Sequence, residues 1–125
     1  MFDMTDLEIA TYSADTMLWQ AGEMFNEDTN WNDHYIPEDA TEDATDRMVS
    51  AIREFVSRVR PEDLAAYLNK YSPTFLVYDY WLTRNHHGSG FWDRGLGPVG
   101  GRLSELSDDG TYVLFQVDEH AWSWE

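Results

Sequence analysis

The sequence has no cysteine among its 125 residues. Disulfide bonds and thiolate metal sites are therefore excluded. It also has no apolar run close to the roughly 18 residues that a membrane span requires. The first residues, MFDMTDLEIATYS, show neither the basic region nor the apolar region of a secretory signal. We therefore expect a soluble protein of the cytoplasm that does not associate with membranes.

Positive charge is scarce. The chain has 8 Lys and Arg against 24 Asp and Glu, a formal net charge of −16, and Lys70 is the only lysine. Thirteen of the acids lie within residues 1–46, which contain no Lys or Arg. Such a field repels nucleic acid and attracts basic protein surfaces, and the sequence shows no basic patch for DNA or RNA. We expect a basic protein partner, such as a nuclease or another nucleic-acid-binding protein, and no direct contact with nucleic acid.

Three causes unrelated to a partner can also produce this acidity, and they stay open at this point. High net charge keeps many proteins soluble. A salt-adapted or GC-rich genome favours Asp and Glu over Lys. The acids on any one helix can also form its solvated face. Net charge therefore bears on solubility and association more than on a particular partner.

Apolar residues make up 42% of the chain and aromatic residues 15%, which is typical of a globular protein. The length fits a single domain, 1–125, with a helical, acidic part at 1–72 and a β-rich part at 73–125. Thr5-x-x-Glu8 forms a capping box that predicts a helix over 5–21, ended by Gly22. The predicted apolar stripe of this helix comprises Leu7, Ala10, Ala14, Met17, Leu18 and Ala21.

A long acidic loop is predicted over 22–40, and a second helix over 39–59. This helix carries its acids in the first half and its bases in the second half, an order that suits the helix dipole. A short third helix begins at Pro61, and Ser72-Pro73 ends it. The apolar stripe of the second helix comprises Ala44, Met48, Ile52, Phe55 and Val59.

From residue 73 the composition favours strands. FLVYDYWLT, residues 75–83, is rich in β-branched and aromatic residues and predicts a strand, with a helical turn at 73–78 before a strand at 79–84 as the alternative. GFWDR, residues 90–94, is predicted as its hairpin partner, a short helix follows around Leu103, and TYVLFQV and HAWSWE predict a final hairpin. The fold class predicted is α+β, with N-terminal helices packed on a small, mostly antiparallel C-terminal sheet.

Between the two predicted strands lies RNHHGSGFWDRGLG, residues 84–97. Its glycines predict turns: Gly88 and Gly90 in the hairpin, and Gly95 and Gly97 after it, each at positive φ. The stretch is neither a Walker loop nor a dinucleotide fingerprint. In a hairpin, Arg84 and Asp93 would pair across the strands, and Arg94 would bind an acid of the first helix or the loop.

The polar and aromatic side chains of this stretch also allow a ligand-binding or catalytic interpretation. His86 or His87 would act as a general base oriented by Asp93, with Arg84 or Arg94 binding an anion. Trp92 or Phe91 would stack on a planar ligand. A metal site from His86, His87, Asp93 and His120 is disfavoured because adjacent histidines on a strand point to opposite faces. We therefore expect no metal and no cofactor. The residues of this alternative site are Arg84, Asn85, His86, His87, Trp92, Asp93 and Arg94.

The run DYWLTRNHHGSGFWDRGLG, residues 79–97, resembles a DFWLTRN-GHG-GFWDRGLG signature found in small acidic proteins of bacteriophages and plasmids. In that group a hydrophobic segment precedes the signature, a helix follows it and a short hairpin ends the chain. The resemblance implies a mobile-element origin and a shared fold, and it implies no chemistry. The chain departs from the group at His86, where the group tends to have glycine, and in the last hairpin, where Asp118-Glu119 replaces a glycine-containing turn.

Two functions follow from these observations. The first is a non-enzymatic accessory protein of a phage or mobile element that binds a basic host or phage protein, in its sharpest form as a DNA mimic or anti-defence inhibitor in the host cytoplasm. The alternative is a small enzyme or ligand-binding domain centred on Arg84–Arg94. The first is preferred because binding requires only the charge asymmetry, whereas catalysis requires an assembled constellation of groups. The predicted acidic binding surface comprises Glu27, Asp28, Asp33, Glu38, Asp39, Glu42, Asp43 and Asp46.

Overall fold

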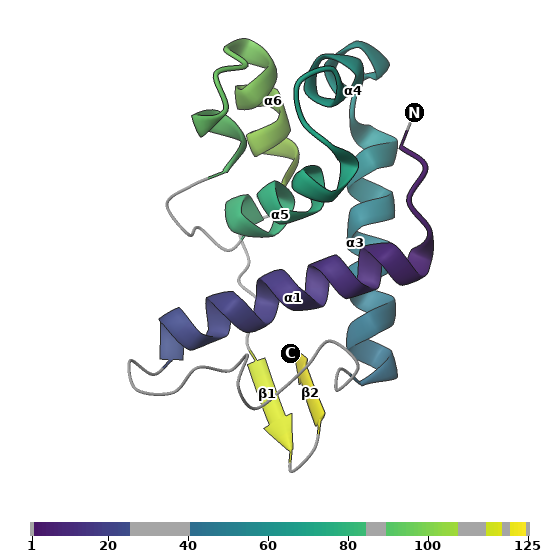
Figure 1. Cartoon of the computed structure of the whole chain (residues 1–125), viewed down its shortest axis with the longest axis vertical. Helices are drawn as coiled ribbons and strands as arrows, with labels where there is room; N and C mark the ends of the chain where they lie inside the picture. Colours follow the sequence, from purple (N-terminus) through teal and green to yellow (C-terminus); the bar gives the residue numbers. More distant parts are fainter. Residues whose placement is uncertain (1, 26–40, 85–89, 108–114, 119–120, 125) are drawn as a thin grey trace.

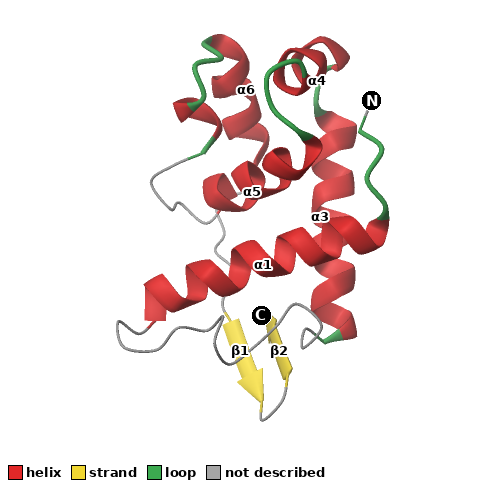
Figure 2. Cartoon of the chain, viewed as in Figure 1, coloured by secondary structure: helices red, strands yellow, loops and turns green. Residues whose placement is uncertain are grey.

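The computed structural model describes the backbone of residues 2–25, 41–84, 90–107, 115–118 and 121–124, with side chains described for 2–16, 41–84 and 90–107. The described chain is predominantly helical (Figure 2). Helix α1 crosses α3, with α4, α5 and α6 on one side of α1 and the two strands on the other (Figure 1). The elements are α1 Asp6–Phe25, α3 Glu42–Arg58, α4 Pro61–Leu68, α5 Pro73–Arg84, the 3-10 helix η2 Phe91–Asp93, α6 Pro98–Ser107, β1 Phe115–Asp118 and β2 Ala121–Trp124.

Helix α1 begins at the predicted capping box. The Thr5 backbone N–H donates to Glu8 Oε1 at 3.0 Å, and the Glu8 N–H donates to Thr5 Oγ1 at 3.1 Å. Its end was predicted wrongly, because the helix continues through Gly22 to Phe25. Of the predicted stripe, Ala10 and Ala14 are buried as expected, but Leu7 is exposed and Ile9 is buried in its place. The side chains of the other three members, Met17, Leu18 and Ala21, lie outside the described residues. The described buried face also includes polar residues, so the apolar pattern of the sequence gives this face only in part.

Helix α3 follows the sequence prediction closely. Thr41 caps it by accepting a hydrogen bond from the Ala44 N–H at 3.1 Å, and Arg58 ends it. All five residues of the predicted stripe are buried. Four of them, all but Ala44, belong to one hydrophobic cluster that also includes residues of α1, α4, α5, η2 and α6. Three aromatic rings lie at its centre: Phe91 of η2 stacks on Phe55 at 5.6 Å and meets Tyr67 edge-on at 5.5 Å.

The α+β fold class predicted from the sequence is wrong. Residues 73–84 form helix α5, so neither the strand at 75–83 nor the alternative strand at 79–84 exists, although the helical turn at 73–78 of that alternative lies within α5. The predicted hairpin partner GFWDR contains the 3-10 turn η2. The aromatic and β-branched residues fit a helix here because most of it is buried, and tertiary packing overrides intrinsic propensity. The Ser72 hydroxyl accepts from the Phe75 N–H at 3.2 Å, so Ser72-Pro73 starts a helix as well as ending the previous segment.

The described strands are limited to one hairpin. β1 and β2 are antiparallel, with Phe115 opposite Trp124 and Asp118 opposite Ala121, and β2 lies against α3. A single two-stranded hairpin does not form a sheet layer on which the helices could pack. The prediction of a β-rich part over residues 73–125 is therefore wrong. Asp118 belongs to β1 rather than to the turn. In the described part of the chain, no helix combines the length and apolarity needed to cross a lipid bilayer.

Candidate functional site

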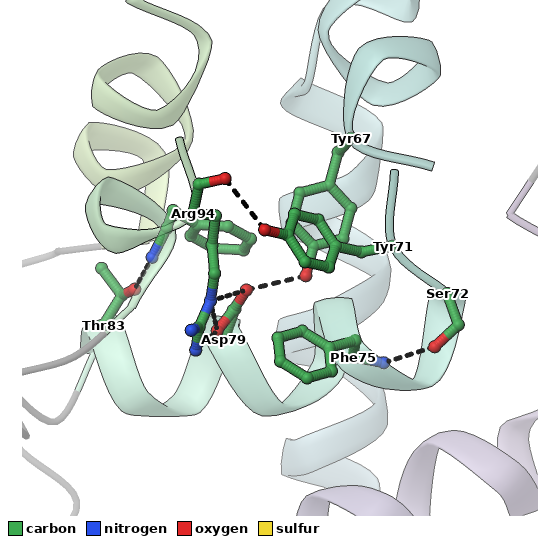
Figure 3. Close-up of polar contacts among 8 residues, drawn as sticks. Tyr67, Tyr71, Ser72, Phe75, Asp79, Thr83 and Arg94 are labelled. Atoms are coloured by element: carbon green, nitrogen blue, oxygen red, sulfur yellow. Dashed lines mark hydrogen bonds and ion pairs between the residues drawn. The ribbon is translucent and has the colours of Figure 1, made fainter. Parts of the chain in front are cut away.

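The described part of the glycine-rich segment is fixed to α5 by a buried ion pair. Asp79 is fully buried. Both of its carboxylate oxygens accept from Arg94 Nε at 3.0 Å, and Oδ1 also accepts from Arg94 Nη2 at 2.6 Å (Figure 3). The Tyr67 hydroxyl donates to Asp79 Oδ2 at 2.7 Å. Arg94 therefore binds an acid of α5. The prediction that it binds an acid of the first helix or the loop is wrong.

Further contacts show that this pair is a structural clamp. The Arg94 carbonyl accepts from the Tyr71 hydroxyl at 2.9 Å and from Lys70 Nζ at 3.0 Å. The Arg94 guanidinium lies over the Phe75 ring, 4.8 Å from its centroid, and its hydrogen bond to Asp79 raises its pKa. Burial, together with the charge of Asp79, raises the pKa of Tyr67 above its ordinary range. The Arg94 guanidinium is therefore already bound to Asp79, and the Tyr67 phenol stays protonated.

The glycines of this segment have two different roles. Gly95 and Gly97 have φ values of 71° and 58°, as the sequence predicts. Gly90 is extended, with φ at 162°, and makes no hairpin turn. A Cβ there would collide with Thr83 Oγ1 and would lie 2.7 Å from the Trp92 ring. Glycine is needed at 90 because η2 approaches α5 closely, with the Phe91 N–H donating to Thr83 Oγ1 at 3.3 Å (Figure 3).

The predicted ligand or catalytic set is only partly placed by the structure. Arg84 ends α5, donates to the Tyr80 hydroxyl at 3.3 Å and lies over the Trp81 ring at 5.5 Å. The two strands that would pair it with Asp93 do not exist, and Asp93 is exposed in η2. Trp92 is 47% exposed. The remaining predicted members, Asn85, His86 and His87, lie outside the described residues, as does His120. No group of three His, Asp or Glu able to hold a metal occurs in the part of the chain that is described.

A groove of about 510 Å³ lies between α1 and α3, and we call it the acidic groove. The Leu7 side chain is 76% exposed beside it. Asp6 is held in place by Arg53, whose Nη2 lies 2.8 Å from Asp6 Oδ1 and also donates to the Met4 carbonyl at 2.8 Å. Asp46 contributes a second carboxylate from α3. The described lining comprises Asp6, Leu7, Ala10, Thr45, Asp46, Val49 and Ser50.

Three of the eight predicted acidic residues are placed by the structure. Glu42, Asp43 and Asp46 are exposed in the first half of α3, and Asp43 pairs with Arg47 at 2.9 Å. The other five, Glu27, Asp28, Asp33, Glu38 and Asp39, lie outside the described residues. Asp46 is the one predicted residue that lines the described groove. Sequence reasoning missed Leu7, which it assigned to the buried stripe of the first helix.

A second hollow, of about 350 Å³, lies between α3, α5 and α6, and we call it the arginine pocket. Arg47, Arg58 and Arg84 line it, and Phe55 and Leu106 add apolar surface. Arg58 pairs with Glu54 one turn earlier on α3. The sequence signal was present, because Arg47, Glu54 and Arg58 repeat at helical spacing on α3. The full described lining comprises Arg47, Ser50, Ala51, Glu54, Phe55, Arg58, Tyr80, Arg84, Leu106 and Ser107.

A third, mostly apolar hollow of about 270 Å³ lies between α1 and α5, and Arg94, Phe75 and Asp15 are part of its lining. The Tyr78 hydroxyl donates to Asp15 at 3.5 Å, and burial together with this carboxylate raises the pKa of Tyr78. The Arg94 guanidinium at its edge is committed to Asp79. This hollow therefore offers packing surface rather than an accessible charge.

The chain matches no protein-family model, no curated protein and no solved structure. The resemblance of residues 79–97 to the phage and plasmid signature therefore stays a prediction. The acidic groove and the arginine pocket, which flank α3, are the candidate sites.

Proposed function

We propose that this protein is a non-enzymatic binding protein that docks a basic, amphipathic segment of a partner protein in the acidic groove. The observation that carries the proposal is the exposed Leu7 side chain in a groove whose described carboxylates are Asp6 and Asp46. An apolar contact flanked by like charges is the complement of a helix that carries leucine on one face and lysine or arginine beside it.

Energetics support this division of roles within the groove. Burying a leucine side chain contributes about 1.5–3 kcal/mol, whereas rim charges mainly accelerate encounter and select the partner. The exposed acids Glu42 and Asp43 extend the negative potential along α3. We therefore expect Leu7 to set how long the complex lasts and the aspartates to set which partners bind.

The class of partner follows from the charge. A protein with a basic face for nucleic acid, a nuclease among them, would be attracted by a surface with the sign of DNA. In that form the protein would be encoded by a mobile element and would inhibit a defence protein in the host cytoplasm. This finer function rests on the docking proposal together with the resemblance of residues 79–97 to proteins of phages and plasmids.

The test uses the full chain and a helical peptide built from leucine and lysine, with a leucine and glutamate peptide as its matched control. We expect the lysine peptide to bind, the glutamate peptide not to bind, and the affinity to fall as salt rises because exposed charges are screened. Leu7→Ala should weaken binding about tenfold, which corresponds to the loss of about 1.4 kcal/mol.

Charge variants separate the groove from the overall acidity. Asp46→Asn removes one negative charge from the groove, and Glu105→Gln removes one from the exposed face of α6. Asp46→Asn should weaken the lysine peptide several-fold, and Glu105→Gln should leave its affinity unchanged. Equal losses in the two variants, or an affinity that ignores Leu7→Ala, would mean that only net charge attracts the peptide, and the proposal would fail.

A further inference from the structure

We propose that Asp46 is the residue of the acidic groove that binds the cationic side chain of the partner, and that Arg53 determines this choice by compensating Asp6. This assignment rests on the docking proposal and adds to it the position of the cation. The groove has two described carboxylates, Asp6 from α1 and Asp46 from α3. Their contacts differ, and the difference decides where a lysine or arginine of the partner can bind.

Asp6 is already bound by a base of α3. Arg53 donates to Asp6 Oδ1 from Nε at 3.2 Å and from Nη2 at 2.8 Å. The same Nη2 donates to the Met4 carbonyl at 2.8 Å, so the guanidinium is attached to the start of the chain through two residues. The pair is exposed and stabilises the fold little, but its two charges cancel for a cation that approaches this end of the groove.

Asp46 has no base one turn away on its own helix. The positions three and four residues from it are Glu42, Asp43, Val49 and Ser50, and none of them carries a positive charge. Asp46 is exposed, and among the described residues no group donates a hydrogen bond to its carboxylate or forms an ion pair with it. Asp46 is therefore the uncompensated carboxylate of the described lining.

The arginine that follows Asp46 in the sequence does not alter this. Successive residues of a helix do not face each other. Arg47 lines the arginine pocket and pairs with Asp43 at 2.9 Å, whereas Asp46 lines the groove. The Asp46 carboxylate and the Arg47 guanidinium therefore lie on different faces of α3.

The two aspartates lie on different walls of the groove, and this gives the partner segment a direction across it. Leu7 follows Asp6 on α1 and is 76% exposed, so the apolar contact lies on the α1 side. Asp46 lies on the α3 side. We therefore expect a leucine of the partner to contact Leu7 and one lysine or arginine beside it to face α3. A second cation on the opposite flank would meet the Asp6–Arg53 pair and add little affinity.

The test is calorimetric titration of full-chain variants with the leucine and lysine peptide at physiological ionic strength, where exposed charges more than about 8 Å apart are largely screened. Arg53→Gln releases the charge of Asp6 and should tighten binding about threefold. The double variant Asp6→Asn with Arg53→Gln loses one negative and one positive charge together, so it should keep the wild-type affinity. Asp46→Asn should weaken binding several-fold.

Two controls separate local charge from net charge and from geometry. Arg60→Gln also removes one positive charge, and Arg60 is exposed at the start of α4 outside the groove lining, so this variant should bind as the wild type does. Arg53→Lys keeps the charge beside Asp6 but loses the forked donors of the guanidinium, and it should also keep the wild-type affinity.

The two proposals fail in different ways. Equal weakening in the double variant and in Asp46→Asn would show that Asp6 also binds the cation, which would overturn the assignment to Asp46 while the docking proposal stands. Equal effects of Arg53→Gln and Arg60→Gln, or a loss of affinity in Arg53→Lys, would overturn the role of Arg53. A wild-type chain that does not bind the peptide would overturn the docking proposal and this assignment together.

Discussion

The acidic groove and the arginine pocket lie on neighbouring faces of the same helix. Asp46 and Val49 of α3 face the groove beside α1, whereas Arg47, Ala51, Glu54 and Arg58 face the pocket beside α5 and α6. Ser50 lines both and marks the border between them. The two described linings differ in their charged side chains. Asp6 and Asp46 line the groove, whereas Arg47, Arg58, Arg84 and Glu54 line the pocket.

The two regions also differ in what holds them. Among the described residues, the groove is lined by α1 and α3, whereas the pocket also needs the end of α5 and the end of α6 in the right place. Those ends are positioned by the buried Asp79–Arg94 pair and by the approach of η2 to α5. Substitutions that disturb this ion pair or this approach should therefore change the geometry of the pocket more than that of the groove.

The largest effect is expected from Asp79→Asn. The change leaves the Arg94 guanidinium beside a neutral group in a largely buried place, and breaking one partner of such a pair costs about 3–5 kcal/mol. Chemical denaturation followed by circular dichroism measures the free energy of unfolding. Tyr67→Phe, which removes one hydrogen bond to the same carboxylate, is the milder comparison at about 1 kcal/mol. Equal stability of Asp79→Asn and the wild type would contradict the clamp.

Gly90→Ala should have the next largest effect, a loss of about 1–3 kcal/mol, because the new methyl group forces α5 and η2 apart. Gly101→Ala is its control. That position is exposed on α6 with nothing near the added methyl group, so alanine should raise stability by about 0.5–1 kcal/mol. Because η2 lies against α5 and does not line the acidic groove, Gly90→Ala should leave the affinity for the lysine peptide unchanged. Weaker binding of the lysine peptide would remove the distinction between the two regions.

A third prediction concerns acid pH. Hydrogen bonds from Arg102 Nε and Nη2 to Asp63, at 2.8 and 2.7 Å, lower the pKa of this carboxyl below its ordinary value of 3.8. The stabilisation is therefore present above the ordinary value and is lost as the pH falls through the lower value of the folded state. Asp63→Asn should cost about 2 kcal/mol at neutral pH and progressively less as the pH falls below the ordinary value of 3.8.

Denaturant titrations of wild type and Asp63→Asn across this pH range measure the effect. Because the Asp63–Arg102 pair joins α4 to α6 outside both linings, the affinity for the lysine peptide at neutral pH should change little. A stability difference that stays constant down to the lowest pH would show that the pair contributes through packing rather than through charge.

Glu54→Gln should have the smallest effect on stability, within about 0.5 kcal/mol, because its pair with Arg58 is exposed. The same change removes the only described carboxylate in the lining of the pocket. The lysine peptide should keep its affinity, because Glu54 does not line the acidic groove. Calorimetry with the lysine peptide checks this, and weaker binding would contradict the assignment of Glu54 to the pocket alone.

The sequence predicts best where one helix face decides the outcome. The stripe from Ala44 to Val59, the capping box at Thr5 and the first-turn proline Pro61 are local patterns, and the structure has them as expected. Helix α5 was missed because its residues are apolar almost throughout, so periodicity could not separate a buried helix from a strand. The burial of Ile9 in place of Leu7 was missed for a related reason, because two stripes compete along α1.

The candidate sites depend on contacts between distant segments, which single-sequence patterns do not define. Asp79 and Arg94 are 15 positions apart, and nothing in their spacing indicates a pair once the predicted hairpin is absent. The predicted acidic surface named Asp46 from charge alone, but the groove depends on Leu7 of another helix. The arginine pocket likewise forms only when α5 is helical, since that places Arg84 beside α3.

The central claim is that a basic segment of a partner binds the acidic groove and not the arginine pocket on the neighbouring face of α3. The most direct measurement is an NMR titration of amide resonances with the lysine peptide. We predict that the peptide shifts the amides of Asp6–Ala10 and Thr45–Val49 and leaves those of Glu54–Arg58 and Arg84 unchanged. Shifts at Glu54–Arg58, or none at Asp6–Ala10, would contradict this claim.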